Sequence, residues 1–435
     1  MSSIAIIASG AISGLGEGAA ATTAGEVGHP ARVAIGGDEE LARAGLARSF
    51  ASRAWPLGDE GRAAALLERA LVACASDLDR VRSGWRDERV GLVLGTSSGG
   101  MRAAERAFAD LAAGKPITDR VAPTYAGPLE RGIRTLRTPL DPCILVLGAC
   151  ASAALSVGLG VRWLERGACD LVIAGGFDEV TVFVAAGFEA LRATTASPPP
   201  RPFRAGRDGM SLGEGAAVVA LVRAGGKGAR AFVTGFGATS DAVHLTAPDR
   251  AGAGLARAAK AALAEAGSGR VDLVSAHGTA TPFNDAAEAR AIASVLGEDL
   301  EHAVVHPFKA QVGHTLGAAG AIELLASVDA LGVPCLDEHC PDGESLQRRV
   351  HAAPDREAGP AQAEGDGTLA GDGVRRGVRK APGLGGAGPP LANARREERV
   401  GLDRAQRRSD HDPRARQRAH LGRQRSEGRQ RHPDQ

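Results

Sequence analysis

The chain has 435 residues, more than one hydrophobic core usually holds, so two core-forming units or one duplicated unit are expected. Hydrophobic residues make up 44% of the chain, aromatic residues only 3%, and glycine is abundant, a composition that favours an α/β fold packed through small side chains. The formal net charge of +1 gives no reason to expect a nucleic acid or an anionic membrane surface as partner.

The first residues, MSSIAIIASGAISG, contain no Lys or Arg, and the first basic residue is Arg32. The stretch therefore lacks the basic region of a secretory signal, is too short to cross a bilayer, and is predicted to form a strand. The six cysteines show no disulfide-framework spacing, which favours the cytoplasm. Cys335, His339 and Cys340 form a weak metal-ligand pattern without a fourth ligand, so no metal is expected.

Apolar runs alternate with helical patterns along the first half. The predicted strands are residues 4–10, 89–95, 143–149, 169–176 and 216–222, and the clearest predicted helices are residues 61–78 and 151–167. This alternation predicts strand–helix–strand units around a sheet that is covered on both faces.

A second set of elements follows and echoes the first. Residues 231–240, AFVTGFGATS, resemble residues 4–13, IAIIASGAIS, since both are strand patterns that run into Gly-Ala-(Ile/Thr)-Ser. The echo predicts an internal duplication, with an N-terminal half at 1–225 and a C-terminal half at 229–331.

The chain changes character after about Leu331. Phe308 is the last aromatic residue, and residues 335–435 are rich in Arg, Gly, Pro, Gln and Asp without a sustained apolar face. Such a composition cannot offset the entropy of ordering, so this segment is predicted to be largely disordered. Out-of-frame translation of the gene would explain this change in composition. A basic tail that binds nucleic acid is the weaker explanation, because Lys and Arg barely outnumber Asp and Glu in the segment.

Cys150 lies where a predicted strand turns into a small-residue helix. Free amides and the dipole at a helix N-terminus favour a thiolate, although free Cys is often only a small buried hydrophobe. Two later segments favour chemistry: AHGTATPFNDAAEA contains His277, and HPFKAQVGHTLGAAGAIE contains Lys309, His314 and Glu323. One cysteine and two histidines at strand ends are a set of side chains suited to covalent acyl transfer.

Several ordered motifs carry a resemblance to a known family: GACASA, RPFRAGRDGMSLGEGAAVV, GFGATSDAVHLTAPD, HGTATPFND and KAQVGHTLGAAGAIE. From about Ile4 to Leu331 the chain resembles the β-ketoacyl-acyl carrier protein synthases of fatty acid and polyketide synthesis, in their elongating, Cys-His-His form. The resemblance implies an acyltransferase with a thiolase-type fold, in which two related halves form five α-β-α-β-α layers. It also implies a dimer, either of two copies or with a paralogous synthase.

The resemblance implies roles for particular residues. Cys150 would accept the acyl group from acyl carrier protein, while His277 and His314 would assist decarboxylation of a malonyl thioester, with Lys309 tuning the site. Asp285 and Glu323 would support these groups, and Thr279 and Thr281 would contact the phosphopantetheine arm, although both could simply cap a turn. No cofactor beyond the carrier's own arm is implied.

The chain departs from the family near its end. The family has a Gly-Phe-Gly-Gly loop between two closing strands, and this chain has only GLGGAG at residues 383–388. The alternative interpretation is therefore a catalytically impaired homologue that serves as a dimer partner.

Overall fold

The computed structural model describes residues 4–23, 31–54, 57–58, 61–223, 228–244, 247–267 and 270–330. The predicted disordered segment 335–435, the pattern at Cys335, His339 and Cys340, and the GLGGAG stretch all lie outside the described residues.

A large mixed sheet forms the centre of the first half. Its strands are β1 (Ile4–Ser13), β2 (Gly16–Glu17), β5 (Val90–Gly95), β6 (Cys143–Val146), β7 (Leu171–Asp178), β9 (Gly215–Arg223) and β10 (Ala231–Val233). They lie in the order β10-β1-β9-β7-β5-β6, with β2 beside β1. Strands β5, β6 and β7 are parallel, whereas β9 is antiparallel to both of its neighbours. All five strands predicted in this half are confirmed.

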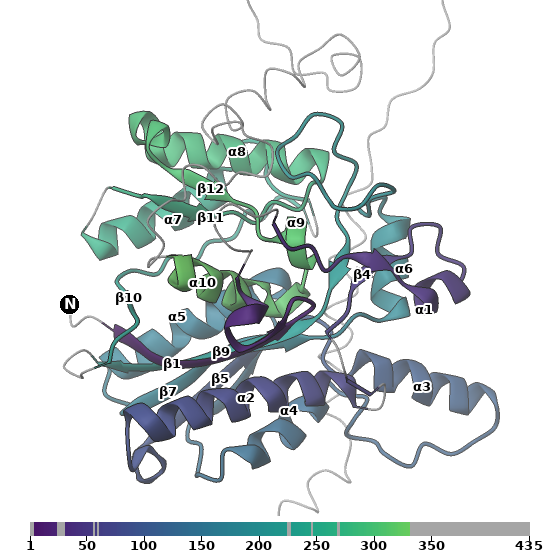
Figure 1. Cartoon of the computed structure of the whole chain (residues 1–435), viewed down its shortest axis with the longest axis horizontal. Coiled ribbons are helices and arrows are strands. Elements are labelled where there is room, and N and C mark those ends of the chain that lie inside the picture. The colour runs from purple at the N-terminus through teal and green to yellow at the C-terminus, as the bar shows by residue number, and fades with distance from the viewer. Residues whose placement is uncertain are drawn as a thin grey trace, which may run out of the picture. The chain divides into compact units, whose positions relative to one another are not determined.

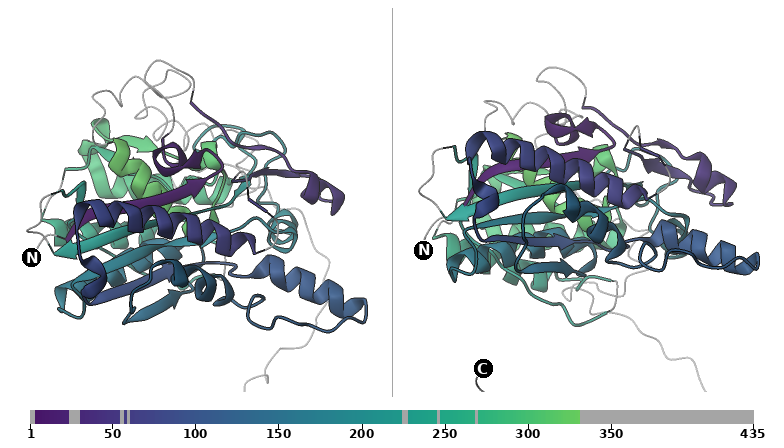
Figure 2. Two further views of the ribbon diagram at one scale, coloured as in Figure 1. Left: turned by 60° about the horizontal axis from the view of Figure 1, so that its bottom comes forward. Right: turned by 90° about the horizontal axis from the view of Figure 1, so that it is seen from below.

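Helices cover both faces of this sheet, as its continuous apolar strands predicted. One face packs against α2 (Arg62–Val81), which in turn packs against α4 (Gly127–Gly132), and α2 lies along the strands when the molecule is seen from below (Figure 2). Leu66, Leu67, Leu71 and Leu78 of α2 are fully buried in that contact. The other face packs against α5 (Ser152–Glu165) and α10 (Ala319–Ala330).

The second half adds two more layers. Strands β11 (Leu273–Ser275) and β12 (Val304–His306) are parallel, α8 (Pro282–Leu296) shares a hydrophobic cluster with β12, and α7 (Ala253–Ala266) packs against α8. Figure 1 shows the succession from α2 and α4 through the large sheet, α5 and α10, then β11 and β12, to α8, with α7 drawn to the left of β11. The predicted five-layered thiolase-type α/β fold is confirmed.

Short elements complete the described part of the chain. They are α1 (Glu39–Arg43), α3 (Met101–Ala112), α6 (Val182–Ala190), α9 (Lys309–Val312), β3 (Gly36–Gly37), β4 (Phe50–Ser52), β8 (Leu212–Gly213), and the 3-10 helices η1 (Gly18–Ala21), η2 (Trp85–Asp87), η3 (Ile133–Thr135), η4 (Ala149–Ala151), η5 (Gly297–Glu301) and η6 (Leu316–Ala318).

The segment that echoes β1 differs from its prediction. Only Ala231–Val233 forms a strand, and it pairs with Ile4–Ile6 of β1 in the first sheet. Beyond it, a Cβ at Gly235 or Gly237 would lie 2.1 or 2.0 Å from a carbonyl oxygen of α7. These glycines therefore pack directly on the α7 backbone, which explains the Gly-x-Gly pattern without a long strand.

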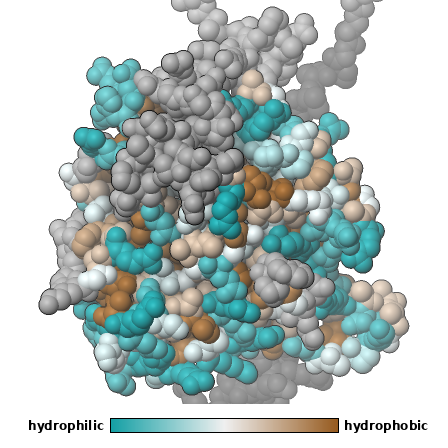
Figure 3. Space-filling view, in the orientation of Figure 1, coloured by the Kyte–Doolittle hydropathy of each residue, from teal (hydrophilic) through white to brown (hydrophobic). Residues whose placement is uncertain are grey.

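Among the described helices, none is both long and apolar enough to span a membrane. On the face drawn in Figure 3, hydrophobic residues form small patches between hydrophilic ones.

Candidate functional site

Cys150 lies in η4, between the end of β6 and the start of α5. The turn is tight, because Ala149 has a φ of 49°, a left-handed conformation that non-glycine residues rarely adopt. The Ser152 hydroxyl stabilises the turn: it accepts from Gly148 N at 2.8 Å and donates to the carbonyl of Ala149 at 2.7 Å. The sulfur is therefore held just beyond the end of β6, the edge strand of the large sheet.

His314 is brought from the other half of the chain to the sulfur of Cys150. Its Nε2 lies 3.0 Å from Cys150 Sγ, although the two residues are 164 positions apart. The backbone of His314 is fixed on β8, since its N–H donates to Ser211 O at 2.8 Å and its carbonyl accepts from Gly213 N at 2.9 Å. The sequence prediction that Cys150 and His314 share one site agrees with this geometry.

A backbone contact assigns the proton on the His314 ring. Nδ1 accepts a hydrogen bond from Leu316 N at 3.1 Å, so the neutral ring carries its proton on Nε2. That N–H points at the sulfur. His314 is thereby a hydrogen-bond donor toward Cys150 and toward any group bound there.

His277 completes a compact trio with Cys150 and His314. The two imidazole rings meet edge to face, with centroids 5.2 Å apart and an interplanar angle of 87°. The Glu288 carboxylate holds the His277 loop, because it accepts from His277 N at 2.5 Å and Gly278 N at 2.8 Å. One nitrogen or sulfur atom from each of the three residues lies within 4.8 Å of the others.

This spacing also invites a comparison with metal sites. A histidine that ligates a metal usually donates its second ring N–H to a carbonyl or carboxylate. His314 does the opposite, since its Nδ1 accepts from a backbone N–H. The trio therefore suits hydrogen-bond donation better than metal ligation.

Lys309 and Glu323 form a buried ion pair beside the trio. Burial and, secondarily, the charge of Lys309 hold the pKa of His277 and of His314 well below the usual histidine value, so both rings are neutral near pH 7. Burial raises the pKa of the Cys150 thiol, and Lys309 opposes this increase. The sequence predicted a thiolate at the helix start, but the resting group is the thiol. The loss of solvent around the sulfur outweighs the stabilisation of a thiolate by the helix N-terminus.

Thr279 and Thr281 face each other, with their hydroxyl oxygens 2.9 Å apart. Thr281 occupies the N-cap position of α8, yet its side chain makes no capping hydrogen bond, so the turn-capping alternative does not hold for it. Asp285 is buried below them and accepts from Phe203 N at 2.7 Å and Ala280 N at 3.1 Å, with Arg207 Nε at 3.3 Å. It thus joins the RPFRAGRDGM segment to the threonine loop.

Backbone strain gathers at this site. Seven described non-glycine residues have positive φ, and four of them, Ala149, Phe203, Ala280 and Leu316, flank the residues above. Such conformations persist where the surrounding structure enforces them, and they are frequent at functional sites.

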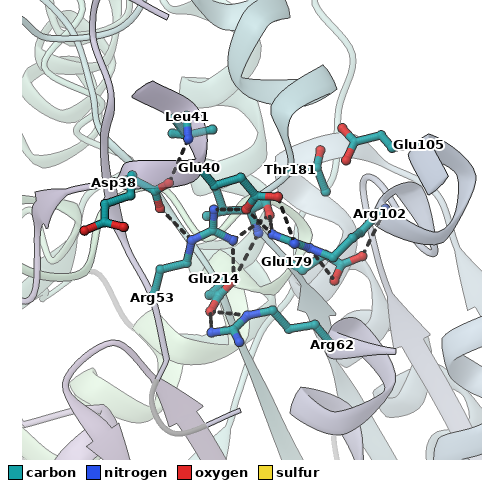
Figure 4. A network of polar contacts seen from close by, with 12 residues as sticks. Asp38, Glu40, Leu41, Arg53, Arg62, Arg102, Glu105, Glu179, Thr181 and Glu214 are labelled. Carbon is teal, nitrogen blue, oxygen red and sulfur yellow. Dashed lines mark hydrogen bonds and ion pairs between the residues drawn. The ribbon is translucent and has the colours of Figure 1, made fainter. Parts of the chain in front are cut away.

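The motifs did not reveal several buried carboxylates. Glu288 follows Asp285 by three positions on α8, and Asp178 ends β7; an acid at the end of a wholly apolar strand was the available signal. Glu214, fully buried, accepts from Arg62 Nε at 2.8 Å and Ala54 N at 2.9 Å (Figure 4). This network fixes the chain just after β8, the strand that contacts His314.

Fold and site together define a thiolase-like protein with a cysteine and two histidines at one point. The family model described as "Beta-ketoacyl synthase, N-terminal domain" matches residues 66–225, and the one described as "Beta-ketoacyl synthase, C-terminal domain" matches residues 230–336. The 3-oxoacyl-(acyl-carrier-protein) synthase 2 of Staphylococcus aureus (strain COL) is 34% identical over 278 residues, which cover 59% of this chain and 67% of that protein.

Solved structures agree with these matches. A β-ketoacyl synthase from Burkholderia phymatum STM815 is 28% identical with a TM-score of 0.66, over 76% of this chain and 86% of that one. The ishigamide ketosynthase/chain length factor gives the same identity, TM-score and coverage. The chain belongs to the β-ketoacyl synthase family.

Proposed function

We propose that the protein condenses an acyl group held on Cys150 with a malonyl thioester, releasing carbon dioxide, in fatty acid or polyketide synthesis. One observation carries this proposal: the protonated Nε2 of His314 lies 3.0 Å from the Cys150 sulfur, with the second neutral imidazole beside it. Family membership supports the same reaction.

In the first step, the Cys150 sulfur attacks the carbonyl of an acyl thioester. A new carbon–sulfur bond forms, the carrier thiol leaves, and the proton of Cys150 passes to the departing sulfur. The raised pKa of the thiol means that most of the resting enzyme holds this proton. The His314 N–H stabilises the developing thiolate, and Lys309 lowers the cost of its charge.

In the second step, a malonyl thioester loses carbon dioxide, and the electron pair of the broken bond moves onto the thioester oxygen as an enolate. Two N–H donors aimed at that oxygen would stabilise it, and neutral imidazoles donate without giving up the proton. The enolate carbon then attacks the acyl group on Cys150, the sulfur leaves, and a β-ketoacyl thioester two carbons longer results.

The substrates would arrive on the phosphopantetheine arm of acyl carrier protein, so the enzyme would need no cofactor of its own. The Thr279 and Thr281 hydroxyls, whose oxygens lie 2.9 Å apart, are the groups we assign to this arm. We place the reaction in the cytoplasm, since Cys74, Cys143, Cys150 and Cys169 are all free thiols.

The partner is a second copy of this chain or a paralogous synthase, and the joining surface is the edge of the large sheet at β6. Within the described residues, β6 pairs with β5 alone, and its neighbourhood exposes Cys143, Ile144 and Leu147. An open apolar edge strand is a template for pairing with another strand. This edge leads directly into the Cys150 turn, so a partner there would also border the site.

The alternative of an impaired dimer partner is not favoured. Its support was the missing Gly-Phe-Gly-Gly loop, in a region outside the described residues. Cys150, His277, His314 and Lys309 are all present and assembled.

Mass spectrometry of the purified protein after incubation with acyl- and malonyl-loaded carrier proteins tests the proposal. We expect acylation of Cys150, release of carbon dioxide, and no acylation of Cys150→Ala. Replacement of His277 by Ala should stop decarboxylation while leaving part of the loading intact. A wild-type protein that no acyl carrier protein acylates would overturn the proposal.

A further inference from the structure

Asp178, the last residue of β7, is fully buried and accepts five hydrogen bonds from two separate segments. Its Oδ1 accepts from Thr96 Oγ1 at 2.7 Å, Ser98 Oγ at 2.6 Å and Ser98 N at 2.9 Å. Its Oδ2 accepts from Ser97 N at 2.7 Å and Gly317 N at 2.6 Å. The carboxylate therefore joins the loop after β5 to the η6 turn.

Both of these segments lead to the reactive pair. Gly317 follows Leu316, whose N–H orients the His314 ring. Thr96, on the other side, accepts through its carbonyl from Ser152 Oγ at 3.1 Å, and Ser152 holds the Cys150 turn. Asp178 is thus the shared anchor between the His314 loop and the Cys150 turn.

The contact at Gly317 leaves no room for adjustment. A Cβ on Gly317 would lie 2.6 Å from both Asp178 Oδ2 and Ser97 N. The η6 backbone therefore rests directly on the carboxylate. A small change at Asp178 would be transmitted to Leu316 and the histidine ring.

Asp178 differs from three other buried acids near the site, which have cationic partners. Glu323 pairs with Lys309, Asp285 with Arg207, and Glu214 with Arg62. Within the described residues Asp178, like Glu288, forms no ion pair, and all five of its donors are neutral. A carboxylate buried without a counter-charge is costly, so a purely structural need would be met more cheaply by a neutral acceptor.

We propose that Asp178 is a positioning residue, which holds the His314 loop against the Cys150 turn so that Nε2–H stays aimed at the sulfur. Its consequence for acyl transfer rests on the proposed function. Its effect on the Cys150–His314 pair does not, because the thiol reacts with simple alkylating agents whatever the substrate.

A double-mutant cycle on the full chain tests this role. The readout is the rate of Cys150 alkylation by iodoacetamide, per folded molecule, across a pH series, with the other five cysteines, Cys74, Cys143, Cys169, Cys335 and Cys340, replaced by Ala. His314→Ala removes the donor to the thiolate and should slow alkylation about tenfold, equivalent to about 1.4 kcal/mol. In the Asp178→Asn background the same replacement should slow it by no more than about twofold, since the donor is already misplaced.

Two further variants make the result decisive. Asp170→Asn, at the residue before β7, removes a partly exposed carboxylate paired with Arg89, and the full His314 effect should persist there. If Asp178→Asn does not fold, Ser98→Ala removes one donor from the same carboxylate and should give a smaller coupling of the same sign.

The proposal would be overturned if His314→Ala slowed alkylation equally in the wild-type and Asp178→Asn backgrounds. If only Ser98→Ala folds, the contradicting outcome is that the effects of His314→Ala and Ser98→Ala on the alkylation rate are fully additive. Loss of the Asp178 charge changes the alkylation rate by the same factor with and without His314. This direct effect therefore cancels when the two His314→Ala effects are compared. If wild-type Cys150 alkylates but is never acylated by a carrier protein, the proposed function fails while the cycle still decides the role of Asp178.

Discussion

At the scale of single residues, burial sets the charge states around Cys150. Desolvation is the larger cause of the low pKa of His277 and His314, and Lys309 is the second. The same desolvation raises the pKa of the thiol. The resting site is therefore neutral apart from the Lys309–Glu323 pair, and it holds two donors ready for a developing anion.

Replacement of Lys309 by Met should raise the pKa of both imidazoles. The ammonium disfavours the imidazolium form, so its removal makes each ring easier to protonate, and Glu323 would take up a proton once left without its partner. Because the reaction needs neutral rings, the acid limb of its pH profile should move to higher pH. NMR titration of the histidines measures the pKa shift. Lys260→Met, at an exposed position on α7, is the control and should leave both pKa values unchanged. An unchanged or lower imidazole pKa in Lys309→Met would contradict the argument.

Glu288 should make stability depend on pH. Burial raises its pKa to about 7 from an ordinary 4.5, so the folded state holds a proton that the unfolded chain releases earlier. The resulting stability is complete below about pH 4.5 and is lost as the pH rises through about 7, with a total on the order of 3 kcal/mol.

Denaturant unfolding of Glu288→Gln at several pH values checks this sign. The variant should lose less free energy of unfolding than the wild type between pH 4.5 and 7. Glu298→Gln, at an exposed position, should keep the wild-type dependence. A steeper dependence in Glu288→Gln would show that another group titrates there.

The sequence identified the residues that contact one another in the site, and Asp285 among those that support them, but not Asp178 or Glu288. Cys150, His277, Lys309, His314 and Glu323 stood out because their chemistry is rare in apolar surroundings. Asp178 acts by accepting main-chain and hydroxyl donors from segments some 80 and 139 positions away. No local pattern encodes such contacts, since they arise only when the strands and loops meet.

At the scale of elements, close backbone approach positions the Cys150 turn. A Cβ at Gly95, the last residue of β5, would lie 2.3 Å from the carbonyl carbon of Ser152 at the start of α5. Only a glycine lets the strand and the helix meet at this distance. The spacing between β5 and α5 therefore sets where Cys150 lies.

Gly95→Ala should destabilise the fold by about 1–3 kcal/mol and slow the reactions of Cys150, because the backbone of α5 must move away. Gly187→Ala is the matched control: it lies within α6, nothing is within 4 Å of its added Cβ, and the change should gain about 0.5–1 kcal/mol. Chemical denaturation and Cys150 alkylation measure both variants. Equal stability of the two would refute the proposed close contact.

Element prediction succeeded where periodicity alone decides the structure. The long apolar runs that form β1, α2 and β9 bury one or both faces of each element. Their hydrophobic residues therefore follow a clear pattern in the sequence. Strands β11 and β12 have three residues each, and the run containing β10 is mostly irregular, because few partner strands exist for it among the described residues. Strand length there depends on tertiary partners, which no local pattern contains.

At the scale of the whole molecule, the layers place the site beside an open sheet edge. The two halves supply Cys150 and the histidines, and their contact through α5 and α10 lies between the two sheets. The division of the chain at residues 225 and 229 remains a prediction. In the dimer that we propose, the β6 edge beside Cys150 would link assembly to activity.

Ile144→Glu should therefore dissociate the dimer that we propose. Ile144 is 41% exposed on β6, and pairing of two β6 edges would bring two glutamates close together, where like charges on facing strands are destabilising. Sedimentation equilibrium at micromolar concentration should show a wild-type dimer and a largely monomeric variant. Val72→Glu, at a valine on α2 that is 49% exposed, should leave the dimer intact, because α2 covers the face of the sheet and not its edge. A monomeric wild type would exclude the homodimer, and equal dissociation of both variants would place the interface away from β6.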